Sequence, residues 1–127
     1  MIPDNTRDAL CRIALQFKMR GNISMIELLM ESGYLENYPQ ITEEHLTEYF
    51  RDHQELIEPW LIESVDNRSG KGWYIEEQEG SFIRRKSWIV GYYPENDKHT
   101  FKNEAEACGF FVKKWAEEIR QVIEKTS

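Results

Sequence analysis

Long apolar runs are missing from this chain of 127 residues. A membrane-spanning helix needs about 20 consecutive apolar residues, and no segment approaches that length. The N-terminal sequence MIPDNTRDAL has neither the basic start nor the apolar stretch of a secretory signal. From the sequence we therefore expect a cytoplasmic protein with no membrane partner.

Cysteine is scarce as well. Cys11 and Cys108 are the only two cysteines, they lie far apart in the sequence, and each falls within a helix-like apolar pattern. In a reducing compartment such residues are small buried hydrophobic side chains, so we expect two free thiols and no disulfide.

Motifs for catalysis and cofactor binding are also missing. Residues 69–72, SGKG, resemble the end of a P-loop, but they lack the upstream glycine spacing and precede a strand pattern. CxxC, HExxH and GxSxG are absent. His45 and His53 share a helix face with acids that could complete a metal site, yet a first-turn polar role and a partly buried role explain them better. Cys108 lies near a helix start but within an apolar stripe, which favours a core role. We expect no catalytic residues, no cofactor and no metal.

What the chain does have is enough apolar material for one core. Hydrophobic residues make up 40% and aromatic residues 13% of the sequence, and a chain of this length buries about two thirds of its unfolded-state surface. No repeat or low-complexity segment divides it. A single domain over residues 1–127 is the prediction.

Helices are predicted for the N-terminal half. The first follows Asp4 and ends at Gly21. The second begins after Ser24, whose spacing to Glu27 is that of a capping box, and ends at Gly33. Residues between Gly33 and position 42 are interpreted as a connector.

A third helix is predicted to begin at Thr42, with acids in its first turn where they favour the helix dipole. Pro59 is expected to end or kink it, with a further helical turn beyond. The apolar side of this helix is made by a periodic set: Leu46, Tyr49, Phe50, His53 and Ile57.

The spacing of apolar residues then changes from that of a helix to that of a strand. Residues 66–72, DNRSGKG, are turn formers that separate the helical half from a β half. Residues 73–79 and 82–93 are predicted to pair as a hairpin with its tip at positions 79–80. Residues 84–86, RRK, interrupt the alternation of the return strand and indicate a bulge or a wider loop.

A turn at residues 94–97 is predicted to precede a short third strand over residues 99–101. Asn103, with Glu106 three residues on, then caps a long amphipathic helix. Its apolar residues recur at helical spacing to the end of the chain: Cys108, Phe111, Val112, Trp115, Ile119, Val122 and Ile123. The predicted fold class is α+β, with N-terminal helices, an antiparallel meander of about three strands, and a C-terminal helix packed on it.

The net charge of −7 comes from one segment. Residues 42–66 hold eight of the 23 acids and one of the 16 bases, Arg51, so that the remaining 15 acids and 15 bases cancel. Acids recur at spacings of four, four and three on one side of the predicted third helix: Glu44, Glu48, Asp52 and Glu55. Like charges four residues apart disfavour a helix by a few tenths of a kcal/mol per pair. This ridge is either a solvated face that keeps the protein soluble or a docking surface for a basic protein.

A basic and aromatic stretch raises the question of nucleic-acid binding. The RRK sequence at residues 84–86 lies between Phe82 and Trp88, an arrangement that can hold single-stranded nucleic acid. The overall charge opposes a polyanion, so direct nucleic-acid binding is not expected. The basic residues are interpreted as charged protection of an edge strand or loop, or as a contact with the acidic helix.

Three segments carry a family resemblance: GWYI at residues 72–75, IVGYYP at residues 89–94 and EAEACGFF at residues 104–111. In a small acidic chain, they resemble the immunity proteins of bacterial contact-dependent inhibition and related polymorphic toxin systems. The resemblance covers about the C-terminal half and carries no binding residue over by position. It implies a non-catalytic protein that binds a cognate toxin domain, often a nuclease, and blocks its active site.

The acidic segment is the surface that we expect to contact such a basic partner. The residues in this hypothesis are Glu44, Glu48, Asp52, Glu55, Glu58, Glu63 and Asp66. Two other classes stay open at this stage. One is a general protein-interaction or regulatory module. The other is a small enzyme or ligand-binding domain, which a concave pocket with converging polar groups would favour.

Overall fold

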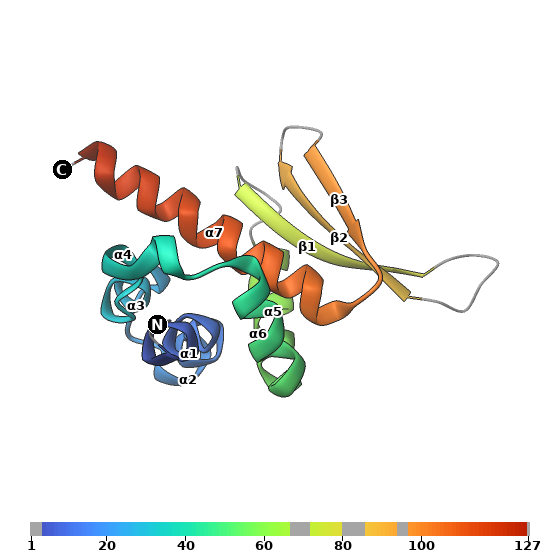
Figure 1. The fold of residues 1–127 in the computed structure, drawn as a ribbon, viewed down its shortest axis with the longest axis horizontal. Helices are drawn as coiled ribbons and strands as arrows, with labels where there is room; N and C mark the ends of the chain where they lie inside the picture. The colour runs from blue at the N-terminus through green and yellow to red at the C-terminus, as the bar shows by residue number, and fades with distance from the viewer. Residues whose placement is uncertain (1–3, 67–71, 80–85, 94–96, 127) are drawn as a thin grey trace.

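Helices form the N-terminal half of the protein, and a three-stranded antiparallel sheet follows them (Figure 1). The computed structural model describes residues 4–66, 72–79, 86–93 and 97–126. A long C-terminal helix, α7 (Glu104–Thr126), packs across the sheet. The α+β class predicted from the sequence is therefore confirmed.

The first predicted helix is two helices, α1 (Asp4–Cys11) and α2 (Ile13–Arg20). They meet at Arg12, where the carbonyl of the preceding Cys11 accepts a hydrogen bond from Nε1 of Trp60 at 2.9 Å. Gly21 ends α2 with φ of 70°, as predicted, and its N–H donates to the carbonyl of Phe17. The glycine is suited to this position because the left-handed conformation costs it nothing.

The second predicted helix is α3 (Met25–Glu31). Ser24 caps it as predicted, because its hydroxyl accepts a hydrogen bond from the Glu27 N–H at 3.1 Å. Gly33 follows with φ of 86°. The connector prediction for the next residues is wrong: they form a short helix, α4 (Tyr34–Asn37), and a 3-10 turn, η1 (Tyr38–Gln40). Tertiary contacts of Tyr34 and Tyr38, described below, hold these turns in place.

The third predicted helix, α5 (Glu43–Asp52), begins at its Thr42 cap as expected but ends at Asp52, seven residues before Pro59. His53 leaves the helix with φ of −134°, and its ring stacks on Tyr49 with centroids 4.0 Å apart. A 3-10 turn, η2 (Gln54–Leu56), and the helix α6 (Ile57–Asp66) follow. Pro59 neither ends nor kinks a helix. It lies in the first turn of α6, where its missing N–H has no intrahelical partner to lose.

The sheet contains β1 (Gly72–Glu79), β2 (Lys86–Tyr93) and β3 (Asp97–Phe101), in that order. Ile75 pairs with Val90, and both are buried. The predicted third strand is confirmed, with two more residues at its start. The predicted hairpin tip at residues 79–80, the RRK sequence and the turn at residues 94–97 fall partly outside the described residues.

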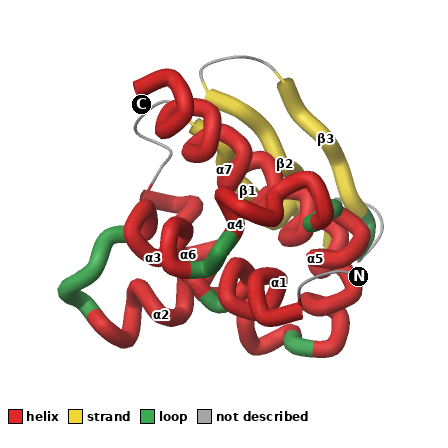
Figure 2. The backbone as a smooth tube through the Cα atoms, turned by 60° about the vertical axis from the view of Figure 1, so that its left-hand side comes forward, coloured by secondary structure: helices red, strands yellow, loops and turns green. Residues whose placement is uncertain are grey.

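Helix α7 lies between the sheet and the N-terminal helices (Figure 2). Asn103 caps it as predicted, since its side-chain oxygen accepts the Glu106 N–H at 3.2 Å. Phe111 and Val112 are buried, but the apolar stripe extends beyond the core. Val122, near the end of the helix, is 57% exposed. Buried apolar residues of the helices and of β1 and β2 form one cluster.

Both cysteines are free and buried, as predicted. Burial raises the pKa of the Cys11 thiol and of the Cys108 thiol. Because a thiol must ionise to act as a nucleophile, the surroundings of Cys108 favour the core role that its place in the apolar stripe predicts.

Candidate functional site

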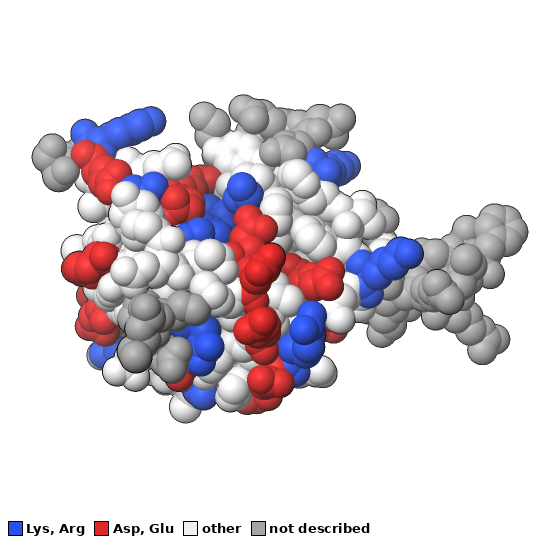
Figure 3. All heavy atoms as spheres, viewed as in Figure 1, with Lys and Arg blue, Asp and Glu red and all other residues white. Residues whose placement is uncertain are grey.

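The acids of α5 line its solvent side. Glu44, Glu48 and Asp52 are all exposed, whereas Leu46 and Phe50 of the same helix are fully buried. Figure 3 shows acidic side chains gathered in a column over α5. We refer to Glu44, Glu48 and Asp52 as the α5 acidic face.

The other four predicted site residues lie beyond α5, so the predicted ridge of four acids on one helix is wrong for Glu55. That residue belongs to η2 and is exposed. Glu58 is exposed in the first turn of α6, Glu63 is half-buried on α6, and Asp66 is the last residue of that helix. Three of the seven acids therefore lie on α5 and three on α6, with Glu55 in the turn between the two helices. The break at His53, which no helix-period argument reveals, separates Glu55 from those on α5.

Two features, one local and one tertiary, fix the position of the α5 acidic face. At the N-terminus, the Thr42 hydroxyl accepts the His45 N–H, and the His45 ring accepts the Thr42 N–H, each at 3.3 Å. Along its length, α5 packs directly on α7 at Gly109. A Cβ atom at position 109 would lie 2.5 Å from Oγ1 of Thr47 and 2.9 Å from its backbone nitrogen. The absence of a side chain at Gly109 is thus what lets the two helices approach.

A groove borders the α5 acidic face. It has a volume of about 330 Å³ and lies between α5, the end of β3 and the first turns of α7. The half-buried rings of Phe101 and Phe110 line it, with centroids 5.2 Å apart. The remaining lining residues are polar or charged: Glu43, Glu44, Thr47, Glu48, Arg51 and Glu106. We call this the α5–β3 groove.

Two wider grooves continue along α7 on the other side of Glu43. One, of about 610 Å³, reaches Trp73 and Tyr92 of the sheet. The other, of about 620 Å³, reaches Tyr38 and Pro39. Glu43, Lys113 and Glu117 line both. Acidic, basic and apolar groups therefore lie near one another along this part of the surface, which suits the binding of an extended partner better than enclosure of a small molecule.

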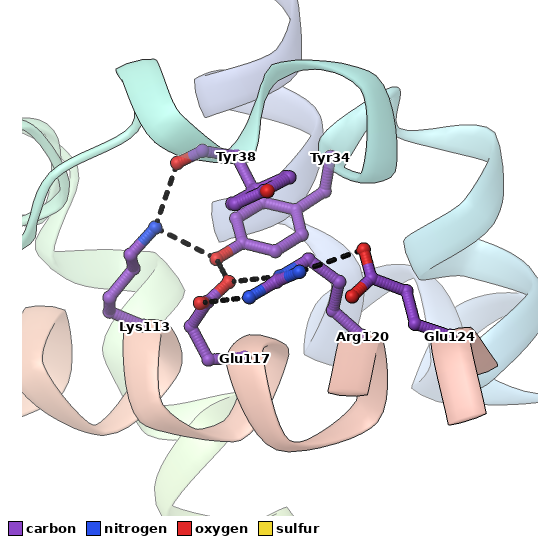
Figure 4. Close-up of polar contacts among 6 residues, drawn as sticks. All are labelled: Tyr34, Tyr38, Lys113, Glu117, Arg120 and Glu124. Carbon is purple, nitrogen blue, oxygen red and sulfur yellow. Dashed lines mark hydrogen bonds and ion pairs between the residues drawn. The ribbon is translucent and has the colours of Figure 1, made fainter. Parts of the chain in front are cut away.

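A partly buried polar cluster connects α7 to α4 and η1 (Figure 4). The Tyr34 hydroxyl donates to Glu117 at 2.5 Å and accepts from Lys113 at 2.8 Å. Lys113 also donates to the carbonyl of Tyr38 at 3.0 Å. Arg120 binds both carboxylate oxygens of Glu117 at 2.9 Å, and its guanidinium lies 3.7 Å from the centroid of the Tyr38 ring.

The ionisation of this cluster follows from burial and from these bonds. Burial raises the pKa of Tyr34, and the hydrogen bond to Glu117 raises it further. Burial lowers the pKa of Lys113. For Glu117, burial raises the pKa, but hydrogen bonds from Arg120 and Tyr34 and the charge of Lys113 outweigh it, so the net shift is downward. The cluster holds α4 and η1 against α7, and each of its charged groups has a partner.

The shift on Glu117 predicts an acid-dependent loss of stability. Because its folded pKa lies below the ordinary value of 4.5, its contribution is complete above that pH and is lost as the pH falls through the folded pKa. Glu117→Gln is expected to lower the free energy of unfolding at neutral pH and to flatten its decrease below about pH 4.5. Urea denaturation across this range measures both effects. Glu36→Gln, at an exposed position of α4, is the control. If the free energy of unfolding decreased equally below about pH 4.5 in Glu117→Gln and in the unmodified protein, the prediction would be contradicted.

Comparison with known proteins gives no family to which this chain can be assigned. No family model, curated protein or solved structure matches it. The resemblance to immunity proteins therefore stays a prediction from the sequence. Any functional conclusion rests on the surface described above.

The described residues were also compared with the patterns of a metal site and of a membrane-spanning helix. Over residues 4–66, 72–79, 86–93 and 97–126, no three histidine, cysteine, aspartate or glutamate side chains come together as metal ligands would. Over the same residues, no helix combines the length and the apolar character of a membrane span. His45 and His53 contact Thr42 and Tyr49 respectively.

Sequence reasoning missed the aromatic and α7 components of the surface. Phe101 and Phe110 are assigned by pattern to a strand and a helix, and no periodicity shows that they share a groove with Glu44 and Glu48. Glu43 was recognised only as a first-turn acid, yet it borders all three grooves. Gly109 is a signal in the sequence that could have indicated this arrangement, because a glycine inside a strongly periodic helix often marks a close contact.

Proposed function

We propose that this protein is a non-catalytic binding protein of the bacterial immunity type, which neutralises a basic toxin domain in the cytoplasm. The observation that carries the proposal is the α5 acidic face beside a groove with an aromatic floor. Exposed carboxylates attract a basic partner at long range and speed its encounter. The groove adds a concave contact with two aromatic rings, the type of side chain that is enriched at the centre of interfaces.

The proposed interface is centred on α5 and extends toward α6. Glu44, Glu48 and Asp52 form its core, and the exposed Glu55 and Glu58 lie further along the chain. Glu63 and Asp66 of α6 complete the proposed acidic surface. A carboxylate array of this kind can occupy the cationic cleft in which a nuclease binds phosphates, so a nuclease is a suitable partner.

Part of the acidity has a purely structural explanation, but not all of it. Glu43 and Glu44 lie in the first turn of α5, where negative charge favours the helix dipole. Glu48 lies beyond that turn, and Asp52 is the last residue of α5, where the dipole disfavours a negative charge. Repulsion between acids four residues apart adds to this cost. Glu48 and Asp52 are therefore acids that the stability of the helix does not require.

Charge reversal tests the proposal. The probe is the C-terminal domain of a large secreted protein encoded beside this gene, which the proposal expects to be small, basic and toxic. Co-expression of the unmodified chain should restore growth of cells producing that domain. Glu44→Lys, Glu48→Lys and Asp52→Lys together should slow association by about tenfold to a hundredfold and weaken its dependence on salt.

The matched control reverses three exposed acids elsewhere, Glu27, Glu31 and Glu36 of α3 and α4. It changes the net charge by the same amount, so it separates the effect of the α5 acidic face from that of overall charge. Stopped-flow association at several salt concentrations measures both variants, with circular dichroism as the check on folding. Equal association rates for the two variants, or a failure of the unmodified chain to restore growth, would count against the proposal.

A further inference from the structure

The α5–β3 groove combines an aromatic floor with acidic walls. Its floor is made by Phe101 at the end of β3 and Phe110 on α7, whose rings are inclined at 48°. Glu44 and Glu48 of α5 line one wall, and Glu106 of α7 lines the groove as well. A side chain entering this groove would contact both aromatic rings and carboxylates.

The carboxylates of the groove are only partly neutralised by the chain itself. Arg51 is the one base among the lining residues, against four glutamates. Its nearest contact with Glu106 is 4.0 Å, longer than a hydrogen bond, and the two side chains are 53% and 51% exposed. Such an exposed pair contributes little and exchanges easily for a better partner. The groove is therefore complementary to an added positive charge.

Several rings of this protein already lie beside its own cationic side chains. Nζ of Lys114 lies 5.2 Å from the centroid of Phe110, on the same ring that floors the groove. Arg120 stacks on Tyr38, and Arg7 lies 5.0 Å from the ring centroid of Tyr49. A guanidinium is planar, weakly hydrated and forked, so it can stack on a ring and bind carboxylates in the same site. An ammonium group is a compact, strongly hydrated charge that fits this combination less well.

We propose that the α5–β3 groove receives the guanidinium of an arginine side chain from the basic partner, as the anchor of that interface. The inference rests on the proposed function, because it names the group by which the partner is recognised. The guanidinium lies against Phe101 and Phe110 and donates to Glu44 and Glu48. This anchor fixes the register of the complex, whereas the rest of the α5 acidic face speeds the encounter.

Small probes test the anchor without any partner. The full chain is titrated with N-acetylarginine methylamide while amide and aromatic NMR signals are followed. Saturable shifts are expected for the Thr47 and Glu48 amides and for the rings of Phe101 and Phe110. N-acetylcitrulline methylamide, which has nearly the same shape but no charge, should give no saturable shift. N-acetyllysine methylamide should bind several times more weakly, because it cannot fork or stack in the same way.

Variants then assign the contacts. Glu44→Gln with Glu48→Gln should weaken binding of the arginine probe by about tenfold, since each glutamine keeps a hydrogen-bond acceptor but loses the negative charge that strengthens the bond. The matched control is Glu27→Gln with Glu31→Gln on α3, which should leave binding unchanged. Phe101→Leu keeps an apolar side chain in the groove but removes one ring. It should therefore lower the affinity for the arginine probe several-fold and reduce the difference in affinity between the arginine and lysine probes. Circular dichroism confirms that each variant is folded.

Three results would overturn the anchor. They are shifts that never saturate and spread over all exposed acids, equal affinity for the arginine and lysine probes, or equal binding by the Glu44→Gln, Glu48→Gln variant and its control. These outcomes leave the proposed function standing if the unmodified chain still restores growth. Conversely, a specific arginine site in a chain that does not restore growth would contradict the toxin-neutralising role alone.

Discussion

Replacement of Trp60 by alanine is expected to lower the free energy of unfolding by about 3–5 kcal/mol. Trp60 is fully buried, and its ring meets Phe111 and Trp115 edge to face with centroids 6.0 Å and 5.0 Å apart. Its Nε1 donates to the carbonyl of Cys11 at 2.9 Å. The substitution removes the side chain that connects α6 to both α7 and the junction of α1 with α2. Equilibrium denaturation in urea measures the loss.

Trp60→Phe separates the ring from the hydrogen bond. Phenylalanine retains most of the apolar contact but leaves the Cys11 carbonyl without its indole donor, a loss of about 1–3 kcal/mol. We expect Trp60→Phe to be clearly more stable than Trp60→Ala. Equal stabilities would mean that the hydrogen bond, and not the packing, accounts for the role of Trp60. A change below about 1 kcal/mol in the alanine variant would contradict the packing argument itself.

The second large effect is expected at Gly109. Alanine favours a helix over glycine by about 1 kcal/mol, so a helical glycine with free space around it would gain stability. At position 109 a methyl group meets Oγ1 of Thr47 at 2.5 Å, the Thr47 nitrogen at 2.9 Å and the Glu43 carbonyl at 3.1 Å. Two of these three atoms are backbone, so α5 itself has to move. Overpacking of this kind costs about 1–3 kcal/mol, and we expect Gly109→Ala to be destabilising and Gly109→Val more so.

Thr47→Ala provides the control for Gly109. It removes the hydroxyl from the contact but leaves the backbone in place. The double variant Thr47→Ala, Gly109→Ala should therefore recover part, and not all, of the lost stability. Thermal unfolding of the unmodified protein, the two single variants and the double variant measures the energetic coupling between positions 47 and 109. A higher melting temperature for Gly109→Ala than for the unmodified protein would show that the two helices are not in the close contact described.

The Gly109 variants also bear on function. A shift of α5 away from α7 moves Glu44 and Glu48 relative to Phe101 and Phe110, and it widens the α5–β3 groove. If a folded Gly109→Ala protein no longer bound N-acetylarginine methylamide, the result would be consistent with the proposed anchor. The acids are unchanged in this variant, so only their position relative to the rings would account for the loss of binding. The solvent-exposed charge remains, so the early, salt-dependent part of partner association should be affected less.

Signals at the ends of helices were reliable because they are local. The side chains of Ser24, Thr42 and Asn103 each accept a backbone N–H within three residues, so the neighbouring sequence is enough to predict the cap. Gly21 and Gly33 adopt the left-handed conformation that glycine favours. The change of period after residue 72 likewise predicted the antiparallel strands.

Predictions that needed a distant partner were wrong. Residues 34–41 read as a connector because the contacts of Tyr34 come from residues 113 and 117 of α7. The end of α5 at Asp52 is the exception, because the stacking of His53 on Tyr49 that accompanies it joins residues only four apart. The junction at Arg12 accompanies a hydrogen bond from Trp60, which lies far along the chain. Local propensity is a weak guide where such contacts decide the conformation.

The sequence by itself determined the α+β class, the capped starts of α3, α5 and α7, and the concentration of negative charge in residues 42–66. These follow from composition, period and capping, which act over a few residues. Only the tertiary structure decided that the acids of α5 border a groove floored by Phe101 and Phe110. That arrangement depends on how closely α5 and α7 approach, and a missing Cβ atom at Gly109 sets this distance between segments more than 60 residues apart.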